Sequence, residues 1–392
     1  MAIPLVVTEV SKLVEFASLH NLELAVRGGG HSTGGTSSTN GGLVIDLSGM
    51  RAVSVDESAK TIIAQGGALW EDVDNAAAAK GLATVGGTVN HTGIGGLTLG
   101  GGFGWLSGRF GSTVDNLLAV KVVVADGRIL AASEAENSDL FWAIRGAGHN
   151  FGVTVEFTFQ AHDLTNEVYA GSLVFTPDKL ASLVDALNAR MAESDPRGAA
   201  MLVFAKPPDM PMALAVVNVF YDGDQAAAEK YFAALLDLQP VAITAKSMPY
   251  NVVNSLLNPM SRHGGRKALK AVTFADFVKP AYVLELWGDF TAKLEANPDL
   301  AATFIAIEFY DLAKTCSVAI QAMAFPNRAT YRAGIIGMAW TDPKADAANR
   351  AWGRSLQAKC RRWVLADEQQ DPASRGEVLE YANYLERKTV FC

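Results

Sequence analysis

Two glycine-rich stretches constrain how the first part of this 392-residue chain can fold. They are residues 27–35, RGGGHSTGG, and residues 86–105, GGTVNHTGIGGLTLGGGFGW. Of the 36 glycines in the chain, 20 lie between residues 28 and 104. Because glycine has no Cβ, it can adopt positive φ, and it lets a ligand come close to backbone N–H groups. Both stretches therefore predict tight loops, which serve either as turns alone or as ligand-binding loops.

The two loops carry no charged side chain except Arg27, the first residue of the stretch 27–35. Residues 28–45 and 81–108 contain no Asp, Glu, Lys or Arg. An anion bound here would be held by backbone N–H groups, as a dinucleotide diphosphate often is. The glycine spacing fits neither the Rossmann G-x-G-x-x-G fingerprint nor a P-loop. Residues 81–108 are long enough to cross a membrane, but their glycines and polar residues favour a buried, loop-rich region, so we expect no membrane segment.

The six histidines are scattered along the sequence. No two have the HxH, HxxH or HxxxH spacing that metal ligands on one element commonly show. The pattern therefore predicts no metal site, and a lone loop histidine is more often structural. The histidines are His20, His31, His91, His149, His162 and His263.

Charge and cysteine content narrow the possible partners and compartment. The net charge is −8 and there is no basic patch, which argues against nucleic acid as a partner. Cys316, Cys360 and Cys392 are widely spaced, and an odd number without a CxxC motif does not suggest a disulfide framework. The start of the chain lacks the basic region of a signal peptide, so a cytoplasmic location is the default expectation. The oligomeric state is not predicted.

The chain is longer than one typical core, so we expect two domains. Up to about residue 165 the pattern predicts helices at 8–21 and 68–81, strands at 23–27, 42–47, 61–67 and 151–162, and a hairpin over 116–133. Beyond it, the pattern predicts amphipathic helices at 177–193 and 224–237, with strands at 200–205, 214–221, 303–310, 317–325 and 331–340. Runs of strands with helices between them indicate an α+β domain, an antiparallel sheet backed by helices.

Several segments, in order along about residues 8–385, carry a family resemblance. They include VRGGGHSTGG, AQGGALWEDVD, GLATVGGTVNHTGIGGLTLGGGFGWLSGRFG, ENSDLFWAIRGAGHNFGVTVEF, AFPNR and YANY. The set resembles the berberine bridge enzyme-like branch of the vanillyl-alcohol oxidase / p-cresol methylhydroxylase (PCMH) superfamily of FAD-linked oxidoreductases. The resemblance implies a two-domain PCMH-type fold: an FAD-binding domain at 1–165, an α+β substrate domain at 166–370, and a shortened C-terminal segment, 371–392, that returns to the FAD domain.

The resemblance also implies a cofactor site. In this family the histidine of the RGGGH loop bonds covalently to the flavin of FAD, and that role falls on His31. The glycine loops would hold the diphosphate and flank the flavin. The implied cofactor residues are His31, Gly28, Gly29, Gly30, Ser32, Val89, Thr92, Gly93, Gly96, Gly100, Gly101, Asn116, Gly152 and Val153.

One departure from the family bears on the number of covalent links. Many relatives carry a second tether, a cysteine in a C-P-x-V-G-like segment. Here Val89 stands at that position, and His91 is the only reactive side chain beside it. A single tether at His31 is therefore expected. Thr92 falls near the position thought to control oxygen access, and its small size is compatible with an oxidase.

The proton acceptor has two candidate locations. Strand alternation in TFIAIEFYDL places Glu308 and Tyr310 on one face with Phe304 and Ala306. Burial of that face would raise the pKa of Glu308 toward neutrality, whereas a strand-end glutamate in water would keep its ordinary value. The strand resembles a family segment whose glutamate is a base in some members, and the second tyrosine of Y-x-N-Y, here Tyr384, is the base in others. The sequence does not choose between Glu308 and Tyr384.

These features lead to one expected activity with alternatives. We expect an FAD-dependent oxidase that takes hydride from a small alcohol, amine or phenolic natural-product intermediate, with O₂ as electron acceptor. A carbohydrate oxidase of the same branch, or a flavin-binding protein without turnover, is the alternative.

Overall fold

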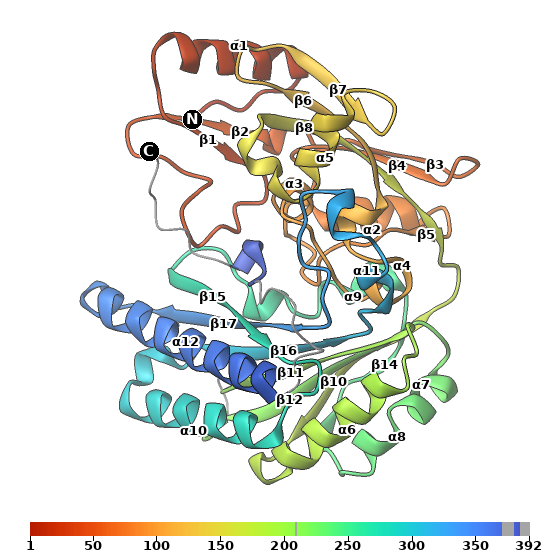
Figure 1. The fold of residues 1–392 in the computed structure, drawn as a ribbon, viewed down its shortest axis with the longest axis vertical. Helices are drawn as coiled ribbons and strands as arrows, with labels where there is room; N and C mark the ends of the chain where they lie inside the picture. The colour runs from red at the N-terminus through yellow and green to blue at the C-terminus, as the bar shows by residue number, and fades with distance from the viewer. Residues whose placement is uncertain (208–209, 371–379, 385–392) are drawn as a thin grey trace. The chain divides into compact units, whose positions relative to one another are not determined.

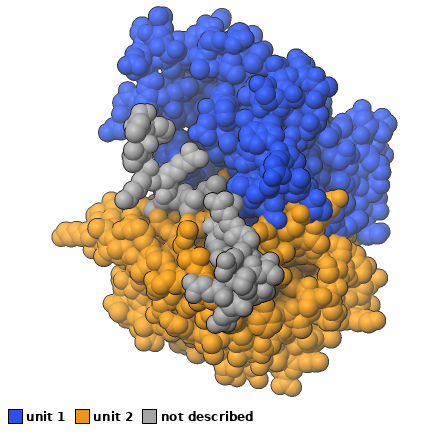
Figure 2. All heavy atoms as spheres, viewed as in Figure 1, with its two compact units in different colours: residues 1–166, 249–263, 317–328 blue, residues 167–248, 264–316, 329–392 orange. Residues whose placement is uncertain are grey.

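The computed structural model describes residues 1–207, 210–370 and 380–384. The chain divides into two compact units (Figure 2). Unit 1 comprises residues 1–166, 249–263 and 317–328, and unit 2 comprises residues 167–248, 264–316 and 329–392. Two short excursions of the chain therefore leave the second unit and belong to the first.

Unit 1 is built on a five-stranded antiparallel sheet in the order β3-β4-β8-β6-β7 (Figure 1). Helices α2, α3 and α5 contribute Trp70, Ile94 and Phe141 to a core that also contains Phe157 and other apolar side chains of the sheet. A smaller core lies under α1. The elements are α1 (Val7–Leu19), β1 (Leu24–Arg27), β2 (Leu43–Asp46), β3 (Val53–Asp56), β4 (Thr61–Gln65), α2 (Trp70–Ala78), β5 (Leu82–Ala83), α3 (Ile94–Leu99), α4 (Ser107–Phe110), β6 (Leu117–Val123), β7 (Ile129–Ser133), α5 (Ser138–Ala147), β8 (Val153–Gln160), β9 (His162–Asp163) and α9 (Tyr250–Val253).

Unit 2 is built on an antiparallel sheet in the order β13-β10-β12-β11-β16-β17-β15, with β14 also paired to β10. Its helices bury their apolar stripes in one core; on α6 the spacing Leu180, Leu183, Val184 and Leu187 is that of one helix face. The elements are β10 (Val168–Phe175), α6 (Leu180–Ala192), β11 (Gly198–Ala205), β12 (Leu214–Tyr221), α7 (Gln225–Tyr231), α8 (Ala233–Leu236), β13 (Ala242–Ile243), β14 (Lys246–Met248), β15 (Arg266–Phe274), α10 (Pro280–Ala296), β16 (Phe304–Tyr310), α11 (Ala313–Cys316), β17 (Arg332–Trp340) and α12 (Asp346–Gln370).

The antiparallel sheet backed by helices confirms the predicted fold class, but one predicted strand is wrong. Residues 317–325 contain a short 3-10 turn, Ile320–Ala322, and lie in unit 1. Their carbonyl groups bond to side chains instead of a neighbouring strand: Trp142 Nε1 donates to Gln321 O at 2.7 Å, and Arg145 Nη2 donates to Ala322 O at 3.4 Å. Although residues 317–325 are largely apolar, their bonds to α5 hold them in an irregular path instead of a strand.

The predicted C-terminal return to the FAD domain concerns residues 371–392. Residues 371–379 and 385–392 lie outside the described residues, and residues 380–384 group with unit 2. The division into three domain segments stays a prediction. Among the helices of the described residues, none is long and apolar enough to span a bilayer.

Candidate functional site

Gly29 and Gly93 bring the two glycine loops of unit 1 into backbone contact. A Cβ on Gly29 would lie 2.2 Å from the backbone N of Gly93, and a Cβ on Gly93 would lie 2.2 Å from the backbone N of Gly29. Both positions therefore require glycine. Gly96, by contrast, is exposed, and a Cβ there would meet nothing within 4 Å. Packing within the protein thus explains the glycines where the loops meet, but it does not explain Gly96. A glycine at this exposed position is expected if a ligand approaches the backbone there.

Other predicted cofactor residues occupy these loops. Gly28 and Gly30 flank Gly29, and Gly30 has a φ of +70°. Val89 and Thr92 form the turn before α3, in which Thr92 N donates to Val89 O at 3.1 Å. The backbone of α3 ends at Gly100, its C-cap, and Gly101 follows with a φ of +116°. The structure thus gathers both sequence-predicted loops in one place.

Asn116 and Ser32 bond within the protein. The Asn116 amide donates to Phe110 O at 3.0 Å and to Ser112 O at 2.9 Å. Its Oδ1 lies 2.7 Å from His162 Nε2. Ser32 Oγ accepts from Thr36 Oγ1 at 2.8 Å, which fixes its own turn. These side chains shape the loops, and a direct role of either in cofactor binding stays a prediction.

Gly152 and Val153 are explained by packing at the start of β8. Gly152 has a φ of +140°, and a Cβ there would lie 2.3 Å from Val123 O. Val153 is buried in the smaller core beside Val10 and Ile45. Their predicted cofactor contact is likewise untested.

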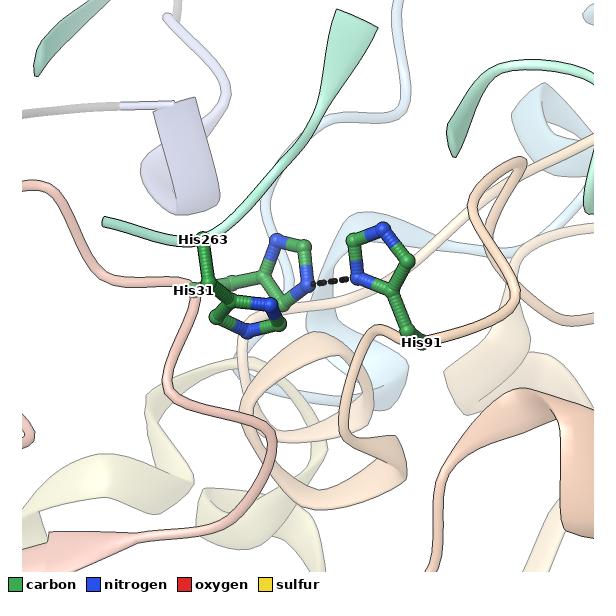
Figure 3. Close-up of side chains that lie close together, drawn as sticks. All are labelled: His31, His91 and His263. Carbon is green, nitrogen blue, oxygen red and sulfur yellow. Dashed lines mark hydrogen bonds between the residues drawn. The ribbon is translucent and has the colours of Figure 1, made fainter. Parts of the chain in front are cut away.

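His31 lies at the meeting point of the loops, beside two histidines that the sequence pattern did not connect with it. Its Nε2 lies 2.8 Å from Nδ1 of His91, and its ring centroid lies 4.7 Å from that of His263 (Figure 3). The absence of HxxH-like spacing suggested scattered histidines, yet the fold brings together three from distant segments. His263 arrives on the excursion 249–263, which no local sequence signal links to the RGGGH loop.

Position 89 is a valine, and no cysteine from elsewhere in the described chain lies in the same unit. Cys316 and Cys360, the two cysteines of the described residues, both belong to unit 2. No described cysteine therefore lies in the unit that carries His31.

A buried ion pair fastens the excursion 317–328 to unit 1. Arg328, in the AFPNR segment, donates from Nη1 and Nη2 to the two carboxylate oxygens of Asp115 at 2.9 and 2.6 Å. Asp115 also accepts from Ser112 N at 2.7 Å. The pairing supports the turn that contains Asn116 and gives the AFPNR motif a structural explanation.

The sequence pattern did not indicate that an aspartate of α2 in unit 1 is buried. Asp74 on α2 is 4% exposed and accepts from Asn254 Nδ2 at 2.8 Å. Burial raises the pKa of Asp74 from its ordinary 3.8 to about 7, although the Asn254 bond opposes the rise. Nothing in the pattern of an amphipathic helix distinguishes Asp74 from a solvated acid.

In unit 2, β16 has the two faces that strand alternation predicts. Ile305, Ile307 and Phe309 lie in the helix-covered core, whereas Glu308 and Tyr310 do not belong to it. Glu308 is nonetheless only 2% exposed, so it is not a strand-end acid in water. It follows directly after Ile307, the last residue of β16 that pairs with β17. The carboxylate thus lies where two central strands separate.

The structure brings Glu308 and Tyr384 together. Tyr384, in the 3-10 turn Ala382–Tyr384, donates its hydroxyl to Glu308 Oε1 at 3.0 Å. Burial raises the pKa of Glu308 from 4.5 to about 8, with the Tyr384 bond acting in the opposite direction. Desolvation and the negative charge of Glu308 raise the pKa of Tyr384 well above 10, and Tyr310 contributes to the rise. The other oxygen of the carboxylate, Oε2, has no hydrogen-bond partner among the described residues.

Comparison with known proteins identifies the family. Residues 2–133 match a family described as an FAD binding domain. The chain is 35% identical over 364 residues to the FAD-linked oxidoreductase pgmH of Aspergillus terreus, covering 91% of this chain and 74% of that protein. It is 38% identical over 186 residues to (R)-6-hydroxynicotine oxidase of Paenarthrobacter nicotinovorans, covering 46% of this chain and 41% of that one.

A solved structure shows the same fold. The 6-hydroxy-D-nicotine oxidase of Arthrobacter nicotinovorans superposes with a TM-score of 0.79 at 24% identity, covering 98% of this chain and 83% of that one. The glycine loops of unit 1 and the antiparallel sheet of unit 2 agree with this relationship. The chain belongs to the FAD-linked oxidoreductases.

Proposed function

We propose that this oxidoreductase removes a hydride and a proton from a small alcohol, amine or phenolic substrate, with FAD tethered through His31 alone. When bound, FAD supplies the hydride-accepting group, while the protein supplies binding, orientation and proton transfer. Support for FAD binding by unit 1 comes from the contact between Gly29 and Gly93 and from the exposed Gly96. Loops without charged residues fit a diphosphate held by backbone N–H groups.

The observation that carries the proton-transfer part is the bond from Tyr384 to the buried Glu308. A general base works best when its pKa lies near the operating pH. The pKa of Glu308, about 8, meets this condition, whereas that of Tyr384 is far too high for a phenolate at neutral pH. We therefore assign the proton to Glu308 at the end of the step, with Tyr384 OH either relaying it or holding the carboxylate.

The electron acceptor in this proposal is O₂, which would be reduced to H₂O₂ by the two electrons and two protons removed from the substrate. Support comes from Thr92, a small residue next to Gly93, and from the similarity to an enzyme named as an oxidase. Solved structures of this fold also include a chitooligosaccharide oxidase, but at 21% identity it bears on the fold alone. A carbohydrate substrate is therefore not favoured. Oxygen consumption with equimolar peroxide formation tests the choice of O₂.

Acid precipitation tests the tether. The yellow colour of the purified protein should stay with the acid pellet, and His31→Ala should release the flavin to the supernatant. His149→Ala, which changes a histidine of unit 1 other than His31, His91 and His263, serves as the control and should keep the colour in the pellet. Colour that washes out of the wild-type pellet contradicts the tether, and flavin mass retained on His31→Ala would transfer the assignment to His91.

A further inference from the structure

Three imidazole rings converge in unit 1 from segments that are far apart in the sequence. His31, His91 and His263 each offer one ring nitrogen, and these three atoms lie within 4.8 Å of one another. The ring centroids are separated by 4.7 to 5.0 Å (Figure 3). The proposed tether uses His31 alone, so it does not explain why His91 and His263 lie beside that residue.

Backbone and side-chain bonds hold the cluster in place. Asn90, next to His91, donates its backbone N to Asn254 O at 2.7 Å, and its Oδ1 accepts from Asn258 Nδ2 at 2.7 Å. Asn254 and Asn258 belong to the same excursion as His263. His91 and His263 are thus linked through neighbouring residues, and their proximity is a built feature of unit 1.

The hydrogen bonds indicate which nitrogens can bind a metal ion. His263 Nε2 lies 2.8 Å from Gly29 O, and because a carbonyl oxygen only accepts, this nitrogen carries the proton. The neutral ring then presents Nδ1 as its electron-pair donor. An imidazole that donates one N–H to a backbone carbonyl and binds metal through the other nitrogen is the usual arrangement in metal sites. On His31 and His91 the facing atoms are Nε2 and Nδ1, at 2.8 Å.

Ring rotations would bring the three nitrogens from these distances to those of a three-histidine metal site. Imidazole nitrogens lie about 2.0–2.1 Å from Zn²⁺, so three of them in tetrahedral geometry are separated by about 3.3 Å. The His31–His91 pair, at 2.8 Å, is slightly closer than that, whereas the three atoms together span up to 4.8 Å, so metal binding opens one separation and closes another. Binding displaces the proton that these two nitrogens share, and the proton leaves to solvent.

We propose that His31, His91 and His263 bind one divalent transition-metal ion of the class that prefers imidazole, such as Zn²⁺, in the flavin-free protein. Imidazole ligands suit Zn²⁺, Cu²⁺ and Ni²⁺, whereas Mg²⁺ and Ca²⁺ require oxygen ligands. Three protein ligands leave a fourth position for water. A metal ion on His31 occupies the side chain that would otherwise be the flavin tether, so metal binding and flavin attachment compete.

Equilibrium dialysis with ZnCl₂ tests the site on the full chain, produced in riboflavin-depleted cells and alkylated at its cysteines. One Zn²⁺ per chain should bind to wild type. His91→Ala and His263→Ala should each weaken binding by more than about 100-fold, the upper end of the loss when only a hydrogen-bond partner of a ligand is removed. His20→Ala, an exposed histidine at the C-cap of α1, should bind as wild type does.

His263 is exposed, so His263→Ala should fold normally, which circular dichroism and a thermal unfolding curve check. Substoichiometric binding to wild type, or unchanged binding by His91→Ala and His263→Ala, would overturn the proposal. A visible d–d spectrum with Co²⁺ that disappears in both variants would support it independently.

A separate experiment examines the competition, and this part rests on the proposed tether. FAD is added to flavin-free protein with and without Zn²⁺, and acid-stable flavin is followed over time. Zn²⁺ should slow its appearance in wild type but not in His263→Ala. If Zn²⁺ binds stoichiometrically yet leaves the rate unchanged, the metal site stands and His31 fails as the tether.

Discussion

Asp74 in unit 1 and Glu308 in unit 2 are both buried acids, and each accepts a hydrogen bond from one side chain. The chemistry of the two donors differs, and so does what each acid can do. Asp74 accepts from the Asn254 amide, and Glu308 accepts from the Tyr384 hydroxyl. Burial raises the pKa of Asp74 to about 7 and that of Glu308 to about 8. A raised pKa alone would therefore mark both as candidate bases.

The donor distinguishes them. An amide cannot pass a proton on at ordinary pH, so we expect the Asp74–Asn254 bond to fasten α2 to the excursion 249–263 without moving a proton. A phenol can lose its proton to the carboxylate as it gains one from elsewhere, so the Glu308–Tyr384 bond can move a proton. Buried acids should thus be compared by what their partners can do as well as by pKa.

Glu308→Gln is expected to give the largest effect. Removal of a general base typically costs about 10²–10⁴-fold in rate, and kcat/KM should fall by that amount. In wild type, kcat/KM should rise with pH as Glu308 ionises, with a midpoint near 8, because only the carboxylate can accept the proton. In Glu308→Gln the residual kcat/KM should lack this rising limb of the pH profile, while the flavin stays bound. If Glu308→Gln retains both the wild-type kcat/KM and the rising limb near pH 8, another residue is the base.

Asp74→Asn should change stability and leave turnover unaffected. In the wild type, Asp74 is protonated in the fold up to about pH 7, whereas in the unfolded chain it ionises near 3.8. The contribution of Asp74 to the free energy of unfolding is therefore largest below about pH 4 and declines as the pH rises to about 7, by up to roughly 4 kcal/mol. The Asn variant should not show this decline and should be the more stable protein at pH 9.

Amide hydrogen exchange in α2 and residues 249–263, measured at pH 5 and pH 9, checks this expectation after correction for the intrinsic rates. The kcat/KM limb near pH 8 should remain. If that limb disappears in Asp74→Asn, the distinction between the two acids is lost.

The sequence carried the information for part of this comparison. Alternation in TFIAIEFYDL placed Glu308 and Tyr310 on one face, because a strand has a period of two residues and the opposite face is filled by Ile305, Ile307 and Phe309. The glycine loops were equally readable, because only glycine tolerates the close backbone approach found between Gly29 and Gly93.

Contacts between distant segments were beyond the local pattern. Tyr384 lies 76 residues from Glu308, so the local pattern could not show that the two candidate bases are hydrogen-bonded to each other. Asp74 acquires its hydrogen-bond donor from the excursion 249–263, and the same excursion carries His263 to the glycine loop of His31. Residues 317–325 look like a strand by composition, but Trp142 and Arg145 bind their carbonyl groups in an irregular path.

Tyr384→Phe should have a smaller effect than Glu308→Gln, and it tests the role of the phenol. A hydrogen bond to a charged group contributes about 1.5–3 kcal/mol, so kcat/KM should fall by roughly 10–100-fold. Because this bond lowers the pKa of Glu308, its loss should also move the rising limb to higher pH. A rate loss without displacement of the limb would mean that Tyr384 acts on the substrate instead of on Glu308. The measurement is kcat/KM from pH 6 to 10.

Asn254→Ala makes the matching change in unit 1 and should have the smallest effect. It removes the donor to Asp74, so the pKa of Asp74 should rise further, as that of Glu308 does in Tyr384→Phe. The lost bond should cost about 1–3 kcal/mol at pH 7, and hydrogen exchange in residues 249–263 should accelerate accordingly. The kcat/KM limb near pH 8 should not move, because Asp74 takes no part in proton transfer. Displacement of that limb by Asn254→Ala, similar to that in Tyr384→Phe, would show that the two acids titrate as one coupled system.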